Sequence, residues 1–390
     1  MANLQRIIST ALAASTFTAT AHAETDFWQA LSNGMVTGGF RVRSESADDS
    51  LNKDAHALTL RSRLSYHSAD YRGFSGALEF DDIRVVAGQD RYSPQNSGFA
   101  QIADPEISEL NQAFIRYRAS PGLNISVGRQ RILLDNQRFV GASAWRQDDQ
   151  TFDALNIDYT YQKFKMTYAY IDNINGVTPA ADASVSHHIA NLGYSWSPAV
   201  ATVLYGYQLD ADQALSLAAS DSRTLGLRVT GKVARKKLAL DYAAEFARQN
   251  AGPYDTEYLL TELSATIDVC KLTFGYENLG SDKGAYGFQT PLATLHAFNG
   301  WADKFGFIPN SGLQDRYVKA GISVFASELK LAYHSFKADE GGGHYGDEFN
   351  AMAGYTINKN LSAGIKYAAY RADDFSADTE KFWLWAEMTF

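Results

Sequence analysis

Arginines occur along the first third of the chain in pairs separated by one residue. A guanidinium group binds both oxygens of a carboxylate through its planar fork, and it keeps its charge at any physiological pH. Apolar residues alternate with these arginines, which in a strand would direct both members of each pair to the same face. The pattern indicates a surface that attracts anions. The pairs are Arg41 and Arg43, Arg61 and Arg63, and Arg116 and Arg118.

The same alternation places other charged residues on that face, and two roles are open for the cations. They could form a path of positive charge that lowers the barrier for anions, or they could pair with acids and stiffen the wall. We expect many of the acids to lie on the opposite arc of the sheet, which would create a transverse field and allow both roles. The further cations are Arg228, Lys319, Lys330 and Lys366, and the acids are Glu79, Asp81, Asp158, Asp241, Glu245, Glu262 and Glu277.

Hydrophobic periodicity close to two runs through almost the whole chain, which is the signal of strands. Eighteen such segments can be counted, and the links between them alternate between short and long. Short links such as 120–122 and 358–360 follow the even-numbered segments, whereas the long links are Gly88–Glu109, Leu134–Thr151, Asp172–His188 and Gly280–Asp315. This alternation predicts an all-β fold: a transmembrane antiparallel up-and-down β-barrel of 18 strands, with short periplasmic turns and long outer loops. A soluble sandwich or solenoid is the alternative.

The hydrocarbon of the membrane explains why the predicted sheet must close on itself. In hydrocarbon an unpaired strand edge leaves backbone N–H and C=O groups without partners, at a cost of several kcal/mol each. Alternation then places Leu58, Leu60 and Leu64 toward lipid and Arg61 and Arg63 toward the lumen. The last segment, 381–390, finishes on Phe390 and resembles the assembly signal of bacterial outer-membrane barrels.

Bulk properties set further limits. Residues 1–23 have the charge, apolar stretch and Ala-His-Ala site of a signal peptide, so we expect export through the Sec pathway. Residues 24–390 lack a linker or a change in composition, and we expect one barrel domain located in the cell outer membrane. The net charge of −9 argues against nucleic acid as a partner. The partners that we expect are outer-membrane lipids and lipopolysaccharide, the barrel assembly machinery through Phe390, and small anionic or saccharide solutes.

Two segments combine arginine, glutamine and aromatic residues at loop positions. The first contains Arg129, Arg138, Arg146 and Asp153, and the second, which lies in the longest link, contains Asn299, Trp301 and Asp303. The longest link is too aromatic and too low in charge for a disordered tether. We therefore expect it to pack in the barrel mouth as a plug or gate.

These two segments carry a resemblance. Gly-Arg-Gln at 128–130, a later Arg, Trp-Arg-Gln at 145–147 and Thr-Phe-Asp-Ala at 151–154, with His-Ala-Phe-Asn-Gly-Trp-Ala-Asp at 296–303, resemble the alginate-export family of outer-membrane porins. The resemblance implies an eighteen-stranded barrel with an arginine-rich lumen that passes an acidic polysaccharide. It also implies that Arg129, Arg138, Arg146, Asp153, Asn299, Trp301 and Asp303 line or shape the mouth. We expect an anionic or oligosaccharide solute, with alginate-like polyuronates among the candidates.

Other classes of function lack their motifs in the sequence. No Gly-x-Ser-x-Gly elbow, His-Glu-x-x-His or phosphate-binding glycine loop is present, so we expect no enzymatic activity, no cofactor and no metal site. The segment 24–34 is too short for the plug domain of an energy-driven receptor. The prediction is a porin for passive diffusion with an anion-selective lumen. The alternatives are a general small-solute porin and a structural or adhesive barrel without solute preference.

Overall fold

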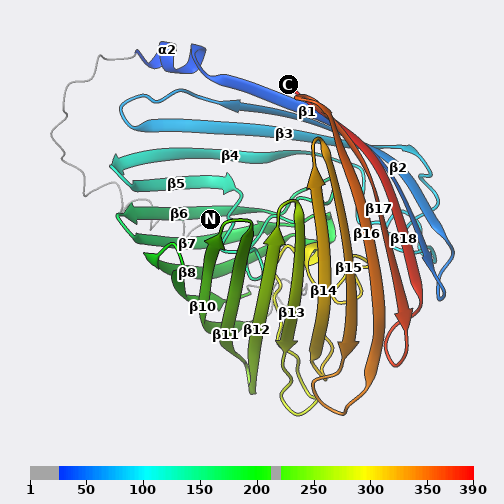
Figure 1. The fold of residues 1–390 in the computed structure, drawn as a ribbon. Coiled ribbons are helices and arrows are strands. Elements are labelled where there is room, and N and C mark those ends of the chain that lie inside the picture. Colours follow the sequence, from blue (N-terminus) through cyan, green and yellow to red (C-terminus); the bar gives the residue numbers. More distant parts are fainter. Residues whose placement is uncertain (1–25, 212–220) are drawn as a thin grey trace.

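The protein forms one closed antiparallel sheet of 18 strands in a computed structural model that describes residues 26–211 and 221–390 (Figure 1). The predicted signal peptide lies outside the described residues. Each strand pairs with its neighbours in sequence, and β1 also pairs with β18. The strands are β1 Met35–Asp49, β2 Ala55–His67, β3 Phe74–Ala87, β4 Ile107–Ser120, β5 Leu123–Gln130, β6 Thr151–Tyr161, β7 Phe164–Asn175, β8 Ala183–Ser197, β9 Val200–Leu209, β10 Ser222–Arg235, β11 Leu238–Ala251, β12 Tyr254–Ile267, β13 Cys270–Leu279, β14 Leu313–Val324, β15 Ser327–Lys337, β16 His344–Asn358, β17 Leu361–Ala372 and β18 Thr379–Thr389.

Pairing between β1 and β18 closes the barrel. Their register runs from Gly39 opposite Thr389 to Asp49 opposite Thr379. The amide of Phe390 donates to the carbonyl of Gly38 at 2.9 Å, and the Phe390 ring lies 6.2 Å from that of Phe40. The predicted closure is confirmed, and with it the fold class.

Side chains alternate between an apolar exterior and a polar interior. Leu64 on β2 and Leu225 and Leu227 on β10 are exposed, whereas Arg61 and Thr224 on the same strands are buried. Because the exterior of the barrel is apolar, hydrocarbon is the solvent that suits it. A short helix, α2 Phe27–Ser32, precedes β1. Among the described residues, no helix has the length and apolar character needed to cross a membrane.

The connections largely follow the predicted order of short turns and long loops, but three of the four predicted long loops are shorter than expected, and the loop predicted at Leu134–Thr151 is 131–150. The link predicted at Asp172–His188 is only 176–182, because β7 and β8 continue past a β-bulge and pair Ile174 with Ala183. The link predicted at Gly88–Glu109 is 88–106, because β4 begins at Ile107, and the link predicted at Gly280–Asp315 is 280–312, because β14 begins at Leu313. The apolar pattern marks only the part of a strand that faces lipid, whereas backbone pairing continues beyond it.

Two loops fold into the barrel rather than away from it. They are loop 131–150, between β5 and β6, and loop 280–312, between β13 and β14. Phe139 of the first contacts Phe288 of the second with ring centroids 6.0 Å apart, and both join a hydrophobic cluster with Tyr258 of the wall. Phe305 belongs to the same buried cluster. Loop 280–312 thus packs inside the barrel, as its composition predicted.

Candidate functional site in the barrel lumen

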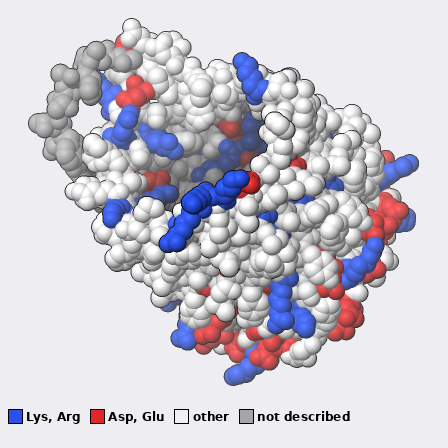
Figure 2. Space-filling view, in the orientation of Figure 1, with Lys and Arg blue, Asp and Glu red and all other residues white. Residues whose placement is uncertain are grey.

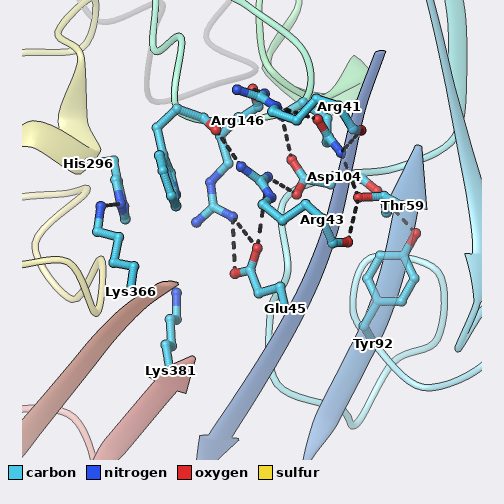
Figure 3. Close-up of polar contacts among 12 residues, drawn as sticks. Arg41, Arg43, Glu45, Thr59, Tyr92, Asp104, Arg146, His296, Lys366 and Lys381 are labelled. Atoms are coloured by element: carbon cyan, nitrogen blue, oxygen red, sulfur yellow. Dashed lines mark hydrogen bonds and ion pairs between the residues drawn. The ribbon is translucent and has the colours of Figure 1, made fainter. Parts of the chain in front are cut away.

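Arginines of β1 hold loop 131–150 against the wall (Figure 3). Arg41 donates to Gln147 Oε1 at 2.8 Å and to the carbonyl of Arg146. Arg43 donates to Asp104 and to the carbonyl of Trp145. Arg41 and Arg43 therefore pack the loops against the barrel wall. This is one of the two roles that the sequence left open for the paired arginines.

Arg146 joins both inward loops to β1. Its guanidinium contacts Glu45 Oε2 at 3.1 Å and Asp303 Oδ2 at 2.6 Å. Lys381 of β18 lies on the same oxygen of Asp303 at 3.2 Å. The side chain of Arg146 is buried, and its carboxylate neighbours Glu45 and Asp303 raise its pKa against the effect of burial. The predicted mouth residues Arg146 and Asp303 therefore form one ion-pair network.

Arg138 makes the second connection between the two loops. Its Nε lies 2.7 Å from Glu277 Oε1 of β13, and its other nitrogens donate to Thr290 and Asn299 of loop 280–312. Asn299 in turn donates to Glu277 Oε2 at 2.7 Å. The ring of Phe298 covers the guanidinium at 4.8 Å. Arg138 and Asn299, both predicted to shape the mouth, thus lie together.

The predicted separation of basic and acidic arcs is wrong for the first strands. Arg63 of β2 contacts Asp81 Oδ1 of the adjacent β3 at 2.7 Å, and it also lies 3.2 Å from Asp149. Arg131 contacts Glu79 and Asp149. Asp81 lies directly opposite Arg63 on the neighbouring strand, because cross-strand pairing places opposite charges side by side. Arg61 donates to Glu387 of β18 at 2.8 Å, across the intervening strand β1.

The remaining predicted site residues lie apart from this network. Arg129 and Asp153 form their own pair at 2.8 Å across β5 and β6, and Arg228 pairs with Glu245 across β10 and β11. Arg116 donates to Ser126 at 3.1 Å. Arg118 is more than half exposed and pairs with Asp70 beside a short turn.

Glu348 of β16 fixes the turn of loop 280–312 that carries Trp301. The carboxylate accepts a hydrogen bond from the backbone N–H of Ala302 at 2.9 Å and another from that of Trp301. Gly300 has φ of +86°, and a Cβ there would lie 2.2 Å from Glu348 Oε2. Glycine is therefore required at 300, both for the left-handed backbone and for the close approach of the carboxylate.

Lys366 of β17 lies among aromatic rings on the inner side of the barrel wall. Its Nζ is 3.9 Å from the ring centroid of Trp145 and 4.0 Å from that of Trp301. It is also 2.6 Å from His296 Nε2. The His296 ring stacks on Trp145 at 5.2 Å, and its Nδ1 lies 2.6 Å from Asp303. We call Trp145, His296, Trp301 and Lys366 the septum.

A cavity lies on each side of the septum. The outer cavity, of about 270 Å³, is lined by Arg146, Lys304 and Lys381 together with the carboxylates of Asp49 and Asp303. The inner cavity, of about 470 Å³, contains four lysines and one carboxylate among its lining residues: Lys271, Lys319, Lys330, Lys366 and Glu262. His296 lines both cavities. Lys271 and Lys330 lie near the short turns, so the inner cavity is the one on the side of the short turns.

Figure 2 shows a hollow in the barrel at the end where α2 lies, with lysine and arginine side chains in its depth. Short turns join the strands at this end. The basic character that the sequence predicted for the lumen is therefore visible from the short-turn side.

Burial and neighbouring charge shift the pKa of three loop residues. Burial, reinforced by Lys366, lowers the pKa of His296 to about 3. Burial, reinforced by Glu109, raises the pKa of Asp148 to about 9. Burial would also raise the pKa of Asp149, but the guanidiniums of Arg63 and Arg131 outweigh it and lower that pKa. At neutral pH His296 is therefore uncharged, and it accepts from Lys366 through Nε2 while donating to Asp303 through Nδ1.

Several residues of the lumen were not singled out from the sequence. Glu348, Lys271 and Lys381 each occupy an inward position of their strand, so the alternation that identified Lys366 also points to them. Asp104 lies in an irregular loop, where no periodicity marks it. Its contact with Arg43 depends on the path of the loop.

The sequence matches a family model for alginate export over residues 36–257, more than half of its length. The chain belongs to the alginate export family. No curated protein matches this family member.

Solved structures similar to this alginate export family member are outer-membrane porins. OccK9 (OpdG) of Pseudomonas aeruginosa has a TM-score of 0.74 at 14% identity, over 93% of this chain and 99% of that one. OpdO of the same organism has a TM-score of 0.74 at 15% identity, over 92% and 98%. OccAB4 of Acinetobacter baumannii has a TM-score of 0.72 at 12% identity, over 92% and 98%. The family member is therefore an outer-membrane barrel of the porin kind.

Proposed function

We propose that the protein is a passive diffusion channel of the outer membrane that prefers anionic solutes, including carboxylated sugars. The observation that carries this proposal is the inner cavity, whose lining includes four lysines and one glutamate, so that basic side chains outnumber acidic ones. A lumen with walls of low dielectric constant concentrates counter-ions and lowers the barrier for the sign of charge that it attracts.

Most of these lysines are available to a solute. Among the described residues, Lys271, Lys319 and Lys366 form no ion pair. Lys330 pairs with Glu328 at 2.8 Å in an exposed position. Glu262, the carboxylate of the cavity, accepts a hydrogen bond from Tyr317 at 2.7 Å. The arginines of β1 and β2 are occupied by loop 131–150 and by acids, so in this proposal they maintain the shape of the lumen while the lysines provide the path for anions.

The solute class follows from the size of the cavity and from its polarity. A volume of about 470 Å³ lies in the range of small-molecule sites. The septum divides it from the outer cavity, so we propose small carboxylates and uronate saccharides as the solutes, with alginate-like chains as an extension that requires the septum to open.

The proposal includes the route of the chain to the membrane. We propose export through the Sec pathway, insertion among outer-membrane lipids and lipopolysaccharide, and assembly through the last strand. In support, β18 is apolar on its outer face, and the adjoining Phe390 is exposed beside Phe40.

Planar-bilayer recordings in a KCl gradient test the proposal. We expect a reversal potential that shows a preference for Cl⁻, and we expect the preference to fall when Lys271, Lys319 and Lys330 are changed together to Gln. The matched control changes three exposed lysines outside the lumen to Gln, namely Lys237, Lys337 and Lys359. A preference for K⁺ would refute the proposal. Absence of selectivity would identify a general porin, and absence of current would identify a structural or adhesive barrel.

A further inference from the structure

The septum lies between the outer and the inner cavity, and three segments of the chain form it. Trp145 comes from loop 131–150, His296 and Trp301 from loop 280–312, and Lys366 from β17. The wall holds Lys366 in place by pairing on both edges of its strand, opposite Met352 on one side and Trp383 on the other. The loops bring the other three residues to it.

Lys366 has a buried amino group, and the groups that its Nζ contacts are all neutral. Its side chain is 5% exposed, and its Nζ contacts two indole faces and one imidazole nitrogen. Cation–π contacts and a neutral acceptor compensate a positive charge there only in part, since a buried ammonium is stabilised most by a hydrogen-bonded anion.

The carboxylate closest to this arrangement is already used. Asp303 lies behind His296, and it accepts from His296 Nδ1, from Arg146 and from Lys381. A carboxylate supplied by a solute would therefore be a stronger partner for Lys366 than any group that the septum provides, because two opposite full charges attract each other and a neutral imidazole does not supply that attraction.

A solute carboxylate reaches Lys366 from one side. Lys366 and Trp301 line the inner cavity, and Lys319 and Lys271 line the same space. Neither Lys366 nor Trp301 is among the residues that line the outer cavity, which instead includes the carboxylates of Asp49 and Asp303. The arrangement favours approach of an anion from the short-turn side.

We propose that Lys366 is a carboxylate-binding subsite at the inner face of the septum, and that a cyclic monocarboxylate opens the septum by replacing His296 as the partner of the ammonium group. This inference deepens the proposed function and rests on it. The ring of the solute takes the place of the His296 ring on the indole of Trp145, which offers a flat apolar face beside the ammonium group.

The opening follows from differential binding. The carboxylate binds Lys366 only after His296 and Trp301 have moved away, so the solute has a higher affinity for the open arrangement and shifts the population toward it. Both residues lie on the stretch 295–303 of loop 280–312, which Glu348 holds through the N–H groups of Trp301 and Ala302. That stretch moves as one unit when the solute binds.

Single-channel recordings of the reconstituted protein test this subsite, with glucuronate added on the short-turn side. We expect glucuronate to raise the open probability, and we expect glucose, which has the ring without the charge, to leave it unchanged. Acetate, which has the charge without the ring, should require a concentration at least tenfold higher. Equal responses to glucuronate and glucose, or to glucuronate and acetate, would overturn the proposal.

Two variants locate the effect. Lys366→Gln should raise the half-maximal glucuronate concentration tenfold or more, the equivalent of one charge-assisted hydrogen bond, and the matched variant Lys337→Gln should leave it unchanged. An unaltered response of Lys366→Gln would refute the subsite. Should that variant fail to fold, Trp301→Ala serves instead: we expect a high open probability without solute, and a closed channel with a normal glucuronate response would refute the proposal.

The outcomes separate this inference from the proposed function. A channel that prefers Cl⁻ but does not respond to glucuronate would refute the subsite at Lys366 and leave the anion channel in place. A channel that prefers K⁺ would remove the basis of both.

Discussion

Removal of Arg138 should release the two inward loops from each other. Its side chain is 1% exposed and that of Glu277 is 3% exposed, with 2.7 Å between Nε and Oε1. Breaking a buried ion pair by removing one partner costs about 3–5 kcal/mol, because the other charge is left uncompensated. Since 1.36 kcal/mol corresponds to a factor of ten, Arg138→Met should shift the equilibrium between packed and released loops by roughly a hundredfold to a few thousandfold.

The assay compares this buried pair with an exposed one. Arg248 and Glu257 have the same chemistry at 2.9 Å, but their side chains are 73% and 57% exposed. Exposed pairs contribute only about 0–1 kcal/mol, so Arg248→Met should leave the loops packed. We expect faster chymotrypsin cleavage within loop 280–312 and a larger conductance for Arg138→Met, and wild-type behaviour for Arg248→Met.

A double variant tests the reasoning itself. When Arg138→Met is combined with Glu277→Gln, neither charge of the buried pair remains. The amide oxygen introduced by Glu277→Gln can still accept the hydrogen bond that Tyr258 donates to the carboxylate at 2.7 Å in the wild type. Most of the lost stability should therefore return. Arg138→Met with wild-type proteolysis and conductance would show that packing of the apolar cluster, and not this ion pair, holds the loops.

Three other predictions follow from the septum and its supports. If His296 regains an ordinary pKa of about 6.5 when the septum opens, the closed state loses about 1.4 kcal/mol per pH unit between about pH 6.5 and 3. The open probability should therefore rise on acidification. A flat pH profile in bilayer recordings, or an unchanged profile in His296→Gln, would contradict this prediction. Since Asp148 is protonated at pH 7, Asp148→Asn should hardly change the free energy of unfolding measured in urea. Asp149→Asn should lower that free energy by about 3–5 kcal/mol, because it leaves two arginines without their partner. Equal effects of the two variants would contradict the opposite pKa shifts. Gly300→Ala should displace Glu348 and raise the conductance, while the neighbouring substitution Gly306→Ala, where a Cβ meets only Leu295 at 3.9 Å, should not.

The barrel could be predicted from the sequence because every strand repeats one rule. Alternation of apolar and polar residues placed Leu64 outside and Arg61 inside, and it also placed Lys319 and Lys366 in the lumen. The short links located the ends of the strands on one side. The rule failed where lipid no longer dictates the pattern, which is why β7 and β8 extend further than predicted.

The partners of the inward residues could not be predicted in the same way. Alternation gives the face of a side chain but not its neighbour across the lumen, so Arg146 was placed at the mouth without its contacts to Glu45 and Asp303. The path of an irregular loop decides these contacts. For Arg63, the register of β2 against β3 decides them, and register is set by turn geometry as well as by pattern.

The septum between the outer and the inner cavity has a consequence for polymers. A solute that fits within one cavity can cross while the barrier opens and shuts behind it, and the membrane leaks for only that moment. A chain longer than both cavities holds the barrier apart for as long as threading lasts. Export of a polysaccharide by this barrel would therefore need the polymer itself to fill the open septum, whereas passage of single sugar acids would not.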